Sequence, residues 1–397
     1  MAKQTIRDLA LNGKRVLVRV DFNVPQTKDG EVSDDRRIRS ALPTLTYALE
    51  QGASLILVSH LGRPSGDPAA DAPFKLDKVA ACLEGLIGRP VRKVDDTVGP
   101  DAQAAAAALK PGEILVVENV RFNKGEKKGD SAFAKELASL ADVYVNDAFG
   151  TCHRDEASMV AVPEQFPAEA RGIGFLVEKE LQILDTLLGR PKTPMVAVMG
   201  GAKVSDKIGV IENLLPKIDR LLIGGAMTYT FLRAQGHATG KSRVEEDKLD
   251  EARRLLALAG EKLVLPKDHL VAAKLDATAA ETQVVVGPEI PEGLLGLDIG
   301  PGAAEEYAAI IQAAGTVIWN GPMGKFEDEP FRKGTMRIAE AMASSPAVTV
   351  VGGGETAEAV EEFGYADKVS HVSTGGGAFL ESLEGKSFNS LKVIPDR

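Results

Sequence analysis

The chain is poor in cysteine, with only Cys82 and Cys152 among its 397 residues. Two thiols are too few for a disulfide framework or a cysteine-ligated metal cluster. No apolar run reaches the ~20 residues that a membrane-spanning helix needs, and the first residues lack the apolar core of a signal peptide. We therefore expect a soluble cytoplasmic protein.

Basic residues are also in the minority. The 47 lysines and arginines face 57 acidic residues, which gives a formal net charge of −10. Such a chain has no global attraction for nucleic acids or for a membrane surface, so we expect neither as a partner. Any anion site must instead concentrate positive charge locally. The length is typical of two or three domains, and an apolar content of 44% is sufficient for their cores.

Apolar runs alternate with helical patterns along the whole chain. The predicted strands are Arg15–Val20, Ser54–Ser59, Ile114–Glu118, Val143–Asn146, Met195–Met199, Arg220–Ile223, Thr316–Trp319, Ala347–Val351 and His371–Ser373. The predicted helices include Arg36–Gln51, Lys75–Leu86, Ser131–Ser139, Val204–Leu215 and Phe331–Ala343. This alternation predicts doubly wound parallel sheets, and so many strands are better divided between two domains. Short β-like runs at 262–298 predict a small irregular subsection of the second domain.

A cluster of proline and glycine residues lies near positions 165–180, and a clear helical pattern, Leu176–Leu188, follows it. Such a cluster is typical of the connection between two domains. We expect the domain boundary in this region, with the helix as the interdomain connector.

Glycine clusters follow three predicted strands of the second half, at Gly200-Gly201, Gly352-Gly353-Gly354 and Gly375-Gly376-Gly377. Glycines that open a helix suit the phosphates of a nucleotide, because bare backbone N–H groups and the helix dipole point at the anion. Lys203 and Lys207 are four residues apart and are expected on one helix face near its N-terminus. Cations are unfavourable at that end of a helix, so this pair favours a bound anion.

The run Gly352–Ala357 also fits the dinucleotide pattern G-x-G-x-x-A. A nicotinamide dehydrogenase needs an acidic residue about 20 residues further on, and Ser370–Gly375 has none, so this activity is disfavoured. Two interpretations stay open for Glu355, which is either a capping acid or a carboxylate facing a magnesium ion carried by nucleotide phosphates. Gly240-Lys241-Ser242 resembles the end of a P-loop, but Gln235 stands where that motif needs glycine, and we reject it.

The first half instead places isolated cationic side chains after predicted strands: Arg19, His60, Arg63, Arg121 and Arg154. Strand ends line the ligand crevice of an open α/β sheet, and fixed guanidinium groups there suit a multiply charged small anion. Asp21 and Asn23 are placed to orient hydroxyl or carboxylate groups. Arg36 and Arg37 open the first long helix, and we expect at least one of them to reach the same crevice. His60 is equally well explained as a buried, satisfied histidine. Two anion sites of different character predict phosphoryl transfer between them.

Seven long motifs in order make the chain resemble the phosphoglycerate kinase family along nearly its whole length. They are Arg19–Pro25 (RVDFNVP), His60–Pro64 (HLGRP), Asn146–Arg154 (NDAFGTCHR), Gly200–Lys207 (GGAKVSDK), Trp319–Glu327 (WNGPMGKFE), Gly352–Thr356 (GGGET) and Val372–Gly377 (VSTGGG). The resemblance implies a bilobal, hinge-bending monomer with two Rossmann-like domains. Residues 1–172 would bind 3-phosphoglycerate or 1,3-bisphosphoglycerate, residues 173–386 would bind Mg²⁺ with ADP or ATP, and residues 387–397 would form a tail returning to the first domain.

The resemblance also implies roles for single residues. Those matching the phosphoglycerate site are Asp21, Asn23, Arg37, His60, Arg63, Arg121 and Arg154, with Arg37 as the catalytic arginine. Those matching the nucleotide site are Lys203, Lys207, Gly296, Asn320, Glu327, Gly353, Gly354, Glu355 and Thr356, with Glu355 at the metal. Ser373, Thr374 and Gly375 match the loop near the transferred phosphate. Lys203 and the backbone at Gly354 and Gly376 would join Arg37 in stabilising the transferring group.

Three departures from the family pattern stand out. Glu355 replaces the usual Asp, Asp155-Glu156 stands where relatives often have Ala-His, and Ser387–Arg397 differs from the usual C-terminal segment. The two acids after Arg154 are expected to weaken the local basic patch. A nucleotide-binding scaffold without activity is the non-enzymatic alternative that these departures would support. The full set of matched phosphate-binding residues favours the enzyme.

Overall fold

The computed structural model describes residues 2–397. The contacts divide the chain into two compact units, one ending at Gln182 and including Ser387–Arg397, the other comprising Ile183–Lys386. The division falls inside helix α7 (Phe175–Leu188), so this helix belongs in part to each unit. None of the helices in residues 2–397 combines the length and the apolar character needed to cross a bilayer.

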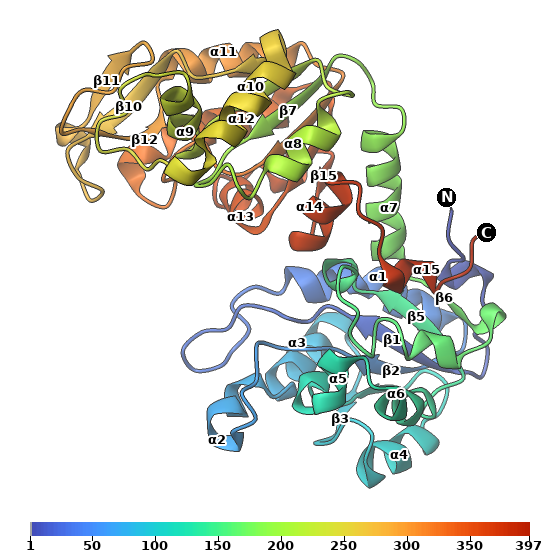
Figure 1. Cartoon of the computed structure of the whole chain (residues 1–397). Coiled ribbons are helices and arrows are strands. Elements are labelled where there is room, and N and C mark those ends of the chain that lie inside the picture. Colours follow the sequence, from blue (N-terminus) through green and yellow to red (C-terminus); the bar gives the residue numbers. More distant parts are fainter. Residues whose placement is uncertain (1) are drawn as a thin grey trace. The chain divides into compact units, whose positions relative to one another are not determined.

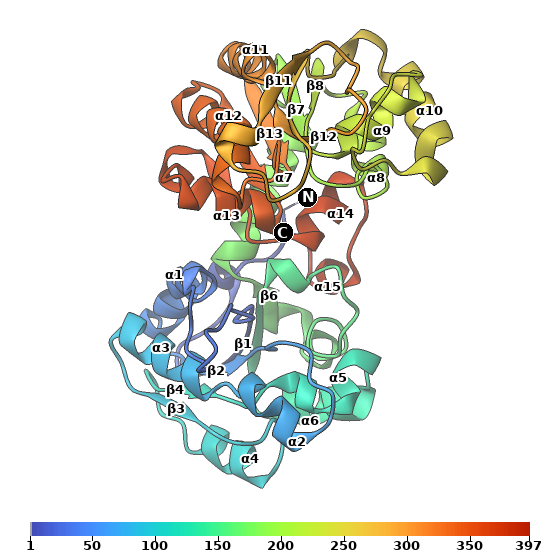
Figure 2. The ribbon, with the colours of Figure 1, turned by 90° about the vertical axis from the view of Figure 1, so that its left-hand side faces the viewer.

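The first unit is built on a six-stranded sheet in the order β3-β4-β2-β1-β5-β6, and all neighbouring strands are parallel. Its strands are β1 (Arg15–Val20), β2 (Ser54–Val58), β3 (Val91–Lys93), β4 (Ile114–Val116), β5 (Val143–Asp147) and β6 (Arg171–Ile173). Its helices, besides part of α7, are α1 (Arg36–Glu50), α2 (Pro68–Asp71), α3 (Asp77–Ile87), α4 (Pro100–Ala107), α5 (Lys124–Lys128), α6 (Ser131–Ala138) and α15 (Asn389–Lys392). Helices α1 and α3 lie on one side of this sheet, and α5 and α6 lie on the other (Figure 2).

The second unit repeats this plan with the strand order β15-β14-β13-β7-β8-β9, again wholly parallel. The strands are β7 (Met195–Met199), β8 (Arg220–Ile223), β9 (Leu263–Val264), β13 (Thr316–Asn320), β14 (Val348–Gly352) and β15 (His371–Val372). The helices are α8 (Ile208–Leu214), α9 (Met227–Ala234), α10 (Leu249–Ala259), α11 (Pro301–Gln312), α12 (Lys333–Ser344), α13 (Gly354–Glu362) and α14 (Gly377–Leu383). A small antiparallel sheet of β10 (Asp268–Ala272), β11 (Gln283–Val286) and β12 (Leu295–Ile299) completes the unit (Figure 1).

The cores follow from the sequence pattern. Val16 and Val18 of β1 are fully buried and pack in one cluster with Ile38 and Leu45 of α1. Strands that are covered on both faces by helices are expected to be almost wholly apolar, as β2 and β7 are. The prediction of two doubly wound α/β units is confirmed.

Most predicted elements agree with the structure to within one or two residues, but one helix does not. The predicted helix Val204–Leu215 begins only at Ile208, because residues 205–207 form a turn closed by a hydrogen bond of 2.8 Å from Lys207 N to Val204 O. The region 262–298 is more regular than expected, since it contributes the small antiparallel sheet.

The C-terminal segment Ser387–Arg397 packs on the first unit. Ser390 Oγ donates to the carbonyl of Cys152 at 2.7 Å, and Gln4 N donates to Pro395 O at 2.9 Å. Asn389 also donates to the carboxylate of Asp155. The segment is therefore fixed to both the N-terminal residues and the loop after β5.

Asp147, at the end of β5, caps the first turn of α7. Its Oδ1 accepts the N–H of Leu176 at 3.0 Å, and its side chain is fully buried. Gly174 is required here, because a Cβ would lie 2.2 Å from that oxygen. Burial raises the pKa of Asp147 to about 7, even though Thr44 and the helix N–H groups stabilise the charged form.

We predict that Asp147→Asn stabilises the protein above neutral pH. The folded state binds the Asp147 proton more tightly than the unfolded chain, whose pKa is near 4, so ionisation costs stability as the pH rises from about 4 to about 7. Asparagine keeps an acceptor for Leu176 without that cost. The free energy of unfolding should rise by on the order of 1 kcal/mol or more at about pH 8, and the gain should vanish near pH 4.

Urea unfolding followed by circular dichroism measures this gain. Asp142→Asn is the control of opposite sign, since hydrogen bonding to Arg15 lowers the pKa of Asp142 and its charge stabilises the fold above about pH 4. A gain for Asp147→Asn that does not change with pH would contradict the explanation.

Candidate functional site

In the first unit, the residues predicted for an anion site lie at the carboxyl end of the parallel sheet. Asp21 and Asn23 follow β1, His60 and Arg63 follow β2, and Arg121 follows β4. Arg154 comes after β5. Since neighbouring parallel strands end at the same edge, all these loops meet there.

His60 lies at the centre of this group and is only 1% exposed. Burial, followed by the positive charges of Arg19, Arg121, Arg154 and Arg37, lowers the pKa of His60 well below its usual value. We call these four arginines the arginine cluster. His60 Nδ1 lies 3.2 Å from Nη2 of Arg19, and a guanidinium can only donate, so Nδ1 is the acceptor and the proton sits on Nε2.

Arg19 supports the cluster from inside the sheet, since it belongs to β1 and is fully buried. Its Nε donates to Ser158 Oγ at 2.8 Å, and Ser158 Oγ donates to Glu126 Oε1 at 2.6 Å. Glu126 is itself buried, and this burial raises its pKa although Arg19 acts against the rise. Arg19 lies within the predicted strand Arg15–Val20, and the structure places it in β1 rather than in the loop that follows.

Arg121 and Arg154 retain buried hydrogen-bond donors without partners. Arg121 Nη1 donates to Gly62 O at 2.9 Å and Nη2 donates to Glu156 Oε1 at 2.6 Å. Arg121 Nε and Arg154 Nη1 are buried and find no acceptor in residues 2–397. Burial and the neighbouring Arg121 lower the pKa of Arg154. Unpartnered buried donors are costly, and an anion would satisfy them.

Arg37 and Asn23 are also held in defined positions. Arg37 Nη1 donates to Asp21 Oδ2 at 2.6 Å, and the Arg37 side chain remains 35% exposed. Asn23 Oδ1 accepts the N–H of Gly62 at 2.8 Å. Arg63, by contrast, is exposed and forms no ion pair with the part of the chain that the structure describes. These interactions therefore link all the predicted residues of this site except Arg63, whose neighbour Gly62 contacts both Asn23 and Arg121.

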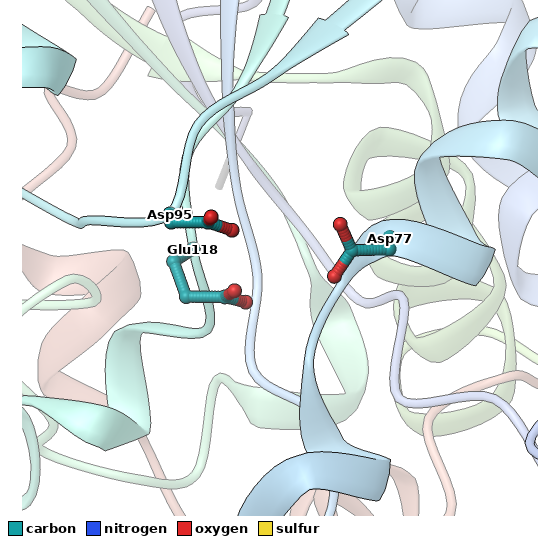
Figure 3. A group of neighbouring side chains, drawn as sticks. All are labelled: Asp77, Asp95 and Glu118. Carbon is teal, nitrogen blue, oxygen red and sulfur yellow. The ribbon is translucent and has the colours of Figure 1, made fainter.

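A separate group of acids in the same unit has the spacing of a metal site. Carboxylate oxygens of Asp77, Asp95 and Glu118 lie within 4.8 Å of one another (Figure 3). The ammonium group of Lys93 is bound to all three, at 2.6 Å from Glu118 and 3.2 Å from Asp77. Burial lowers the pKa of Lys93, but these hydrogen bonds outweigh it and raise the pKa. The acids therefore hold a lysine, and they join α3 to the ends of β3 and β4.

In the second unit, the glycine loops follow β7, β13, β14 and β15 at one edge of the sheet. Asn320 ties three of them together. Its backbone carbonyl accepts from Gly200 N at 2.9 Å, and its Nδ2 donates to Gly352 O at 2.6 Å. Its Oδ1 accepts from the ammonium of Lys207. The loops are thereby locked side by side.

The two lysines of the first glycine loop have different surroundings. Lys207 is only 9% exposed, and burial lowers its pKa although Asp206 and Glu355 oppose the change. Lys203 is exposed and precedes the turn, so the two do not share a helical face as the sequence predicted. Lys207 is the N-cap residue of α8, and Lys203 projects from the loop that follows Gly200-Gly201.

A pocket of about 270 Å³ lies beside these loops. Its walls include three predicted residues, Gly296, Glu327 and Glu355, and the backbone of Gly201 and Gly225. Gly296 must be glycine, because a Cβ would lie 1.7 Å from the hydroxyl of Tyr229. The lining is mainly apolar, as is typical of pockets that bind small molecules.

Buried polar groups form part of the same pocket wall. Asp298 is 3% exposed and accepts N–H groups from Ile299 and Gly334, while burial raises its pKa to about 8. His269, which lies beside Tyr229, is fully buried, and burial lowers its pKa to about 4. Both groups are therefore held largely uncharged at neutral pH.

The glycines after β14 and β15 open two helices. Gly353 has φ +92° and caps α13, and a Cβ on it would lie 2.5 Å from Asn320 Nδ2. Gly376 has φ +47° and caps α14. Gly354 and Glu355 are exposed in the first turn of α13, whereas the Thr356 hydroxyl accepts the N–H of Gly321 at 2.7 Å. Exposed backbone N–H groups at a helix start suit phosphate oxygens.

Sequence reasoning did not assign Glu156 a partner, and it did not place Tyr229 or His269 in the pocket. Glu156 forms an ion pair with Arg121 across a sequence separation of 35 residues. Such long-range pairing leaves no local pattern. The sequence does carry a signal for Arg19, because a single arginine inside the apolar strand VLVRV must be buried with partners.

Comparison with known proteins gives a consistent result. The family model described as phosphoglycerate kinase matches residues 6–386. Phosphoglycerate kinase of Moorella thermoacetica is 54% identical over 400 residues, covering 100% of both chains, and that of Rubrobacter xylanophilus is 53% identical over 397 residues, covering 100% of this chain and 99% of its own. The solved phosphoglycerate kinases of Coxiella burnetii and Pyrococcus horikoshii OT3 superpose with TM-scores of 0.88 and 0.86, at 41% and 31% identity, each covering 98% of both chains.

We predict that His60 stays neutral, with its proton on Nε2, at pH 6. Burial and the arginine cluster oppose a further positive charge, and Arg19 occupies Nδ1 as a donor. Long-range ¹H–¹⁵N correlation spectra identify the tautomer and its titration. Arg19→Met should raise the pKa of His60, because it removes one charge and frees Nδ1. A His60 midpoint near 6.5 in the parent protein would refute the assignment.

Proposed function

Since the chain belongs to the phosphoglycerate kinase family, we propose how its two units divide the family's reaction between them. The chain catalyses the reversible transfer of a phosphoryl group from 1,3-bisphosphoglycerate to ADP, which gives 3-phosphoglycerate and ATP. The N-terminal domain, residues 1–172, binds the phosphoglycerate, and residues 173–386 bind the nucleotide with Mg²⁺. The arginine cluster with its unpartnered buried donors is the observation that carries this assignment.

The phosphoglycerate carries a phosphate at one end and a carboxylate or acyl phosphate at the other. Arg121 and Arg154 bind one charged end with donors that have no acceptor among residues 2–397, and His60 adds its Nε2–H. Asp21 and Asn23 orient the hydroxyl and carboxylate end, and Arg37, whose side chain is 35% exposed, reaches the reacting group. Arg63, which forms no ion pair within residues 2–397, closes on the ligand from the loop.

The nucleotide base lies in the pocket beside Gly296, and Glu327 binds the ribose. Lys207 and the N–H groups at the start of α13 meet the nucleotide phosphates, with Asn320 positioning the Lys207 ammonium. Thr356, whose hydroxyl already accepts from Gly321, supports this loop and adds its backbone N–H. Ser373, Thr374 and Gly375 form the loop near the transferred phosphate.

The residues present fit a magnesium ion. Glu355 offers an exposed carboxylate that lines the nucleotide pocket, and carboxylate oxygens combined with phosphate oxygens are the ligands that Mg²⁺ prefers. When bound with the nucleotide, Mg²⁺ neutralises phosphate charge. Glu355 is one methylene longer than the family's usual Asp and still places its charge in the first turn of α13.

The chemistry is direct in-line transfer. The acceptor oxygen of ADP is already anionic, so transfer toward ATP needs no general base, and catalysis consists of positioning and charge stabilisation. Arg37, Lys203 and the backbone N–H groups at Gly354 and Gly376 stabilise the charge that develops on the transferring oxygens. The two units close around the substrates to exclude water, with α7 and Phe149–Thr151 as the hinges. The enzyme acts as a monomer in the cytoplasm, where glycolysis supplies both substrates.

We predict that Arg37→Ala lowers kcat by at least ~10²-fold, as the loss of one preorganised charge-stabilising group does. The assay is ATP-dependent phosphorylation of 3-phosphoglycerate, coupled to NADH oxidation by glyceraldehyde-phosphate dehydrogenase. Arg36→Ala is the matched control, because Arg36 is bound by the carboxylate of Asp34, whereas Arg37 is bound by Asp21. No turnover in the parent would refute the function, and an unchanged kcat at saturation in Arg37→Ala would refute the role of Arg37.

We also predict that Glu355→Ala raises the KM for the magnesium–nucleotide complex and shifts the optimum to higher Mg²⁺. The mutation removes the only carboxylate in the first turn of α13. Glu358→Ala, one turn further along the same helix and also exposed, should leave both quantities unchanged. Identical Mg²⁺ dependence in Glu355→Ala and the parent would remove Glu355 from the metal site.

A further inference from the structure

A buried carboxylate lies among the arginines of the proposed substrate site. Glu156 is only 6% exposed. Its Oε1 accepts from Arg121 Nη2 at 2.6 Å, and its Oε2 is 4.0 Å from Arg19 Nη2. Its charge also acts on Arg154, whose pKa it raises against the lowering by burial and by Arg121. One carboxylate thus faces three members of the arginine cluster.

The backbone around Glu156 holds the carboxylate in place. Ala157 N donates to Glu126 O at 2.8 Å, and Ser158 N donates to Glu126 Oε2 at 3.0 Å. Met159 N and Val160 N both donate to the carbonyl of Glu156. The preceding residue, Asp155, is bound by Asn389 of the C-terminal segment. Glu156 therefore stays in the cluster rather than swinging in from a loose loop.

We propose that Glu156 is an affinity-setting residue, an internal counter-ion that occupies Arg121 and weakens the binding of the anionic phosphoglycerate. The inference rests on the proposed function of the arginine cluster as the substrate site. A carboxylate and a phosphate use the same fork of guanidinium donors, so the side chain competes with the ligand for Arg121. Its negative charge also lowers the positive potential that attracts a multiply charged anion.

The counter-ion has a second consequence for the protein without substrate. Several guanidinium groups packed around a neutral histidine repel one another, and a buried carboxylate between them reduces that repulsion. Glu156 thus favours the substrate-free cluster at the expense of substrate affinity. Weaker binding of 3-phosphoglycerate favours its release as a product.

The isosteric change Glu156→Gln separates charge from shape. The glutamine oxygen still accepts from Arg121, and Oε2 accepts no hydrogen bond from residues 2–397, so an amide nitrogen in its place breaks none. We expect the KM for 3-phosphoglycerate to fall by roughly three- to tenfold at low ionic strength, because one opposing charge is removed from a partly desolvated anion site. The KM for the magnesium–nucleotide complex should not change. Replacing any arginine of the cluster by a neutral residue should instead raise the KM for 3-phosphoglycerate.

Two further variants keep the test decisive. Glu156→Asp retains the charge and should leave the KM for 3-phosphoglycerate within about twofold of the parent. Asp130→Asn makes the same charge change at the N-cap of α6, where asparagine caps as well as aspartate, and should have no such effect. Thermal unfolding verifies that each variant is folded at the assay temperature.

An unchanged or higher KM for 3-phosphoglycerate in folded Glu156→Gln would overturn the proposal, and so would an equal fall in Asp130→Asn. Calorimetric titration with inorganic phosphate tests the counter-ion without turnover. Tighter phosphate binding by Glu156→Gln in a protein that does not phosphorylate 3-phosphoglycerate would support the counter-ion and refute the proposed function. Equal phosphate binding by both proteins, with normal turnover, would refute the counter-ion alone.

Discussion

Parallel pairing of the strands determines where each unit can hold a ligand. In an open parallel sheet the carboxyl ends of all the strands lie at one edge. The loops that follow them therefore meet there, even when they come from distant parts of the sequence. In the first unit this edge gathers side chains from the ends of β1, β2 and β4 and from the loop after β5. In the second unit it gathers four glycine loops, and Asn320 locks three of them together. The parallel arrangement of the strands therefore determines which residues can meet, and individual side-chain contacts then fix their positions.

In the function proposed above, the two edges bind phosphate groups in an acidic chain by different means. The first unit uses charged side chains, and its arginines are paired with carboxylates. Asp21 pairs with Arg37, and Glu156 pairs with Arg121. Buried charges need such partners, because removing a charged group from water is costly unless an opposite charge lies beside it. The second unit uses backbone N–H groups and helix starts, which carry partial charge without an ionisable group. Among the described residues of these loops, Lys207 is the one buried cation of the second unit. Burial lowers its pKa.

The sequence predicted the fold well because the information was local. The apolar runs of β1, β7 and β8 match the structure at both ends, since strands buried on both faces have a clear composition. It failed at the start of α8, because the turn before Ile208 depends on tertiary contacts of Lys207 with Asn320. It also located the cationic loops, but not the pairing within them. That pairing is decided by side-chain geometry between segments far apart in the chain, and composition does not encode it.

Side-chain sites and backbone sites differ in how they tolerate change. At Gly296 a single methyl group would meet the Tyr229 hydroxyl, and at Gly353 it would meet Asn320 in a backbone conformation that L side chains rarely adopt. These positions accept only glycine, so steric contacts fix the proposed nucleotide site of the second unit. The arginine cluster is held instead by a balance of charges, in which a carboxylate changes the affinity without changing the fold. A side chain such as Glu156 binds an arginine of the cluster without being part of the sheet, so a change there alters the charge balance and leaves the strands in place.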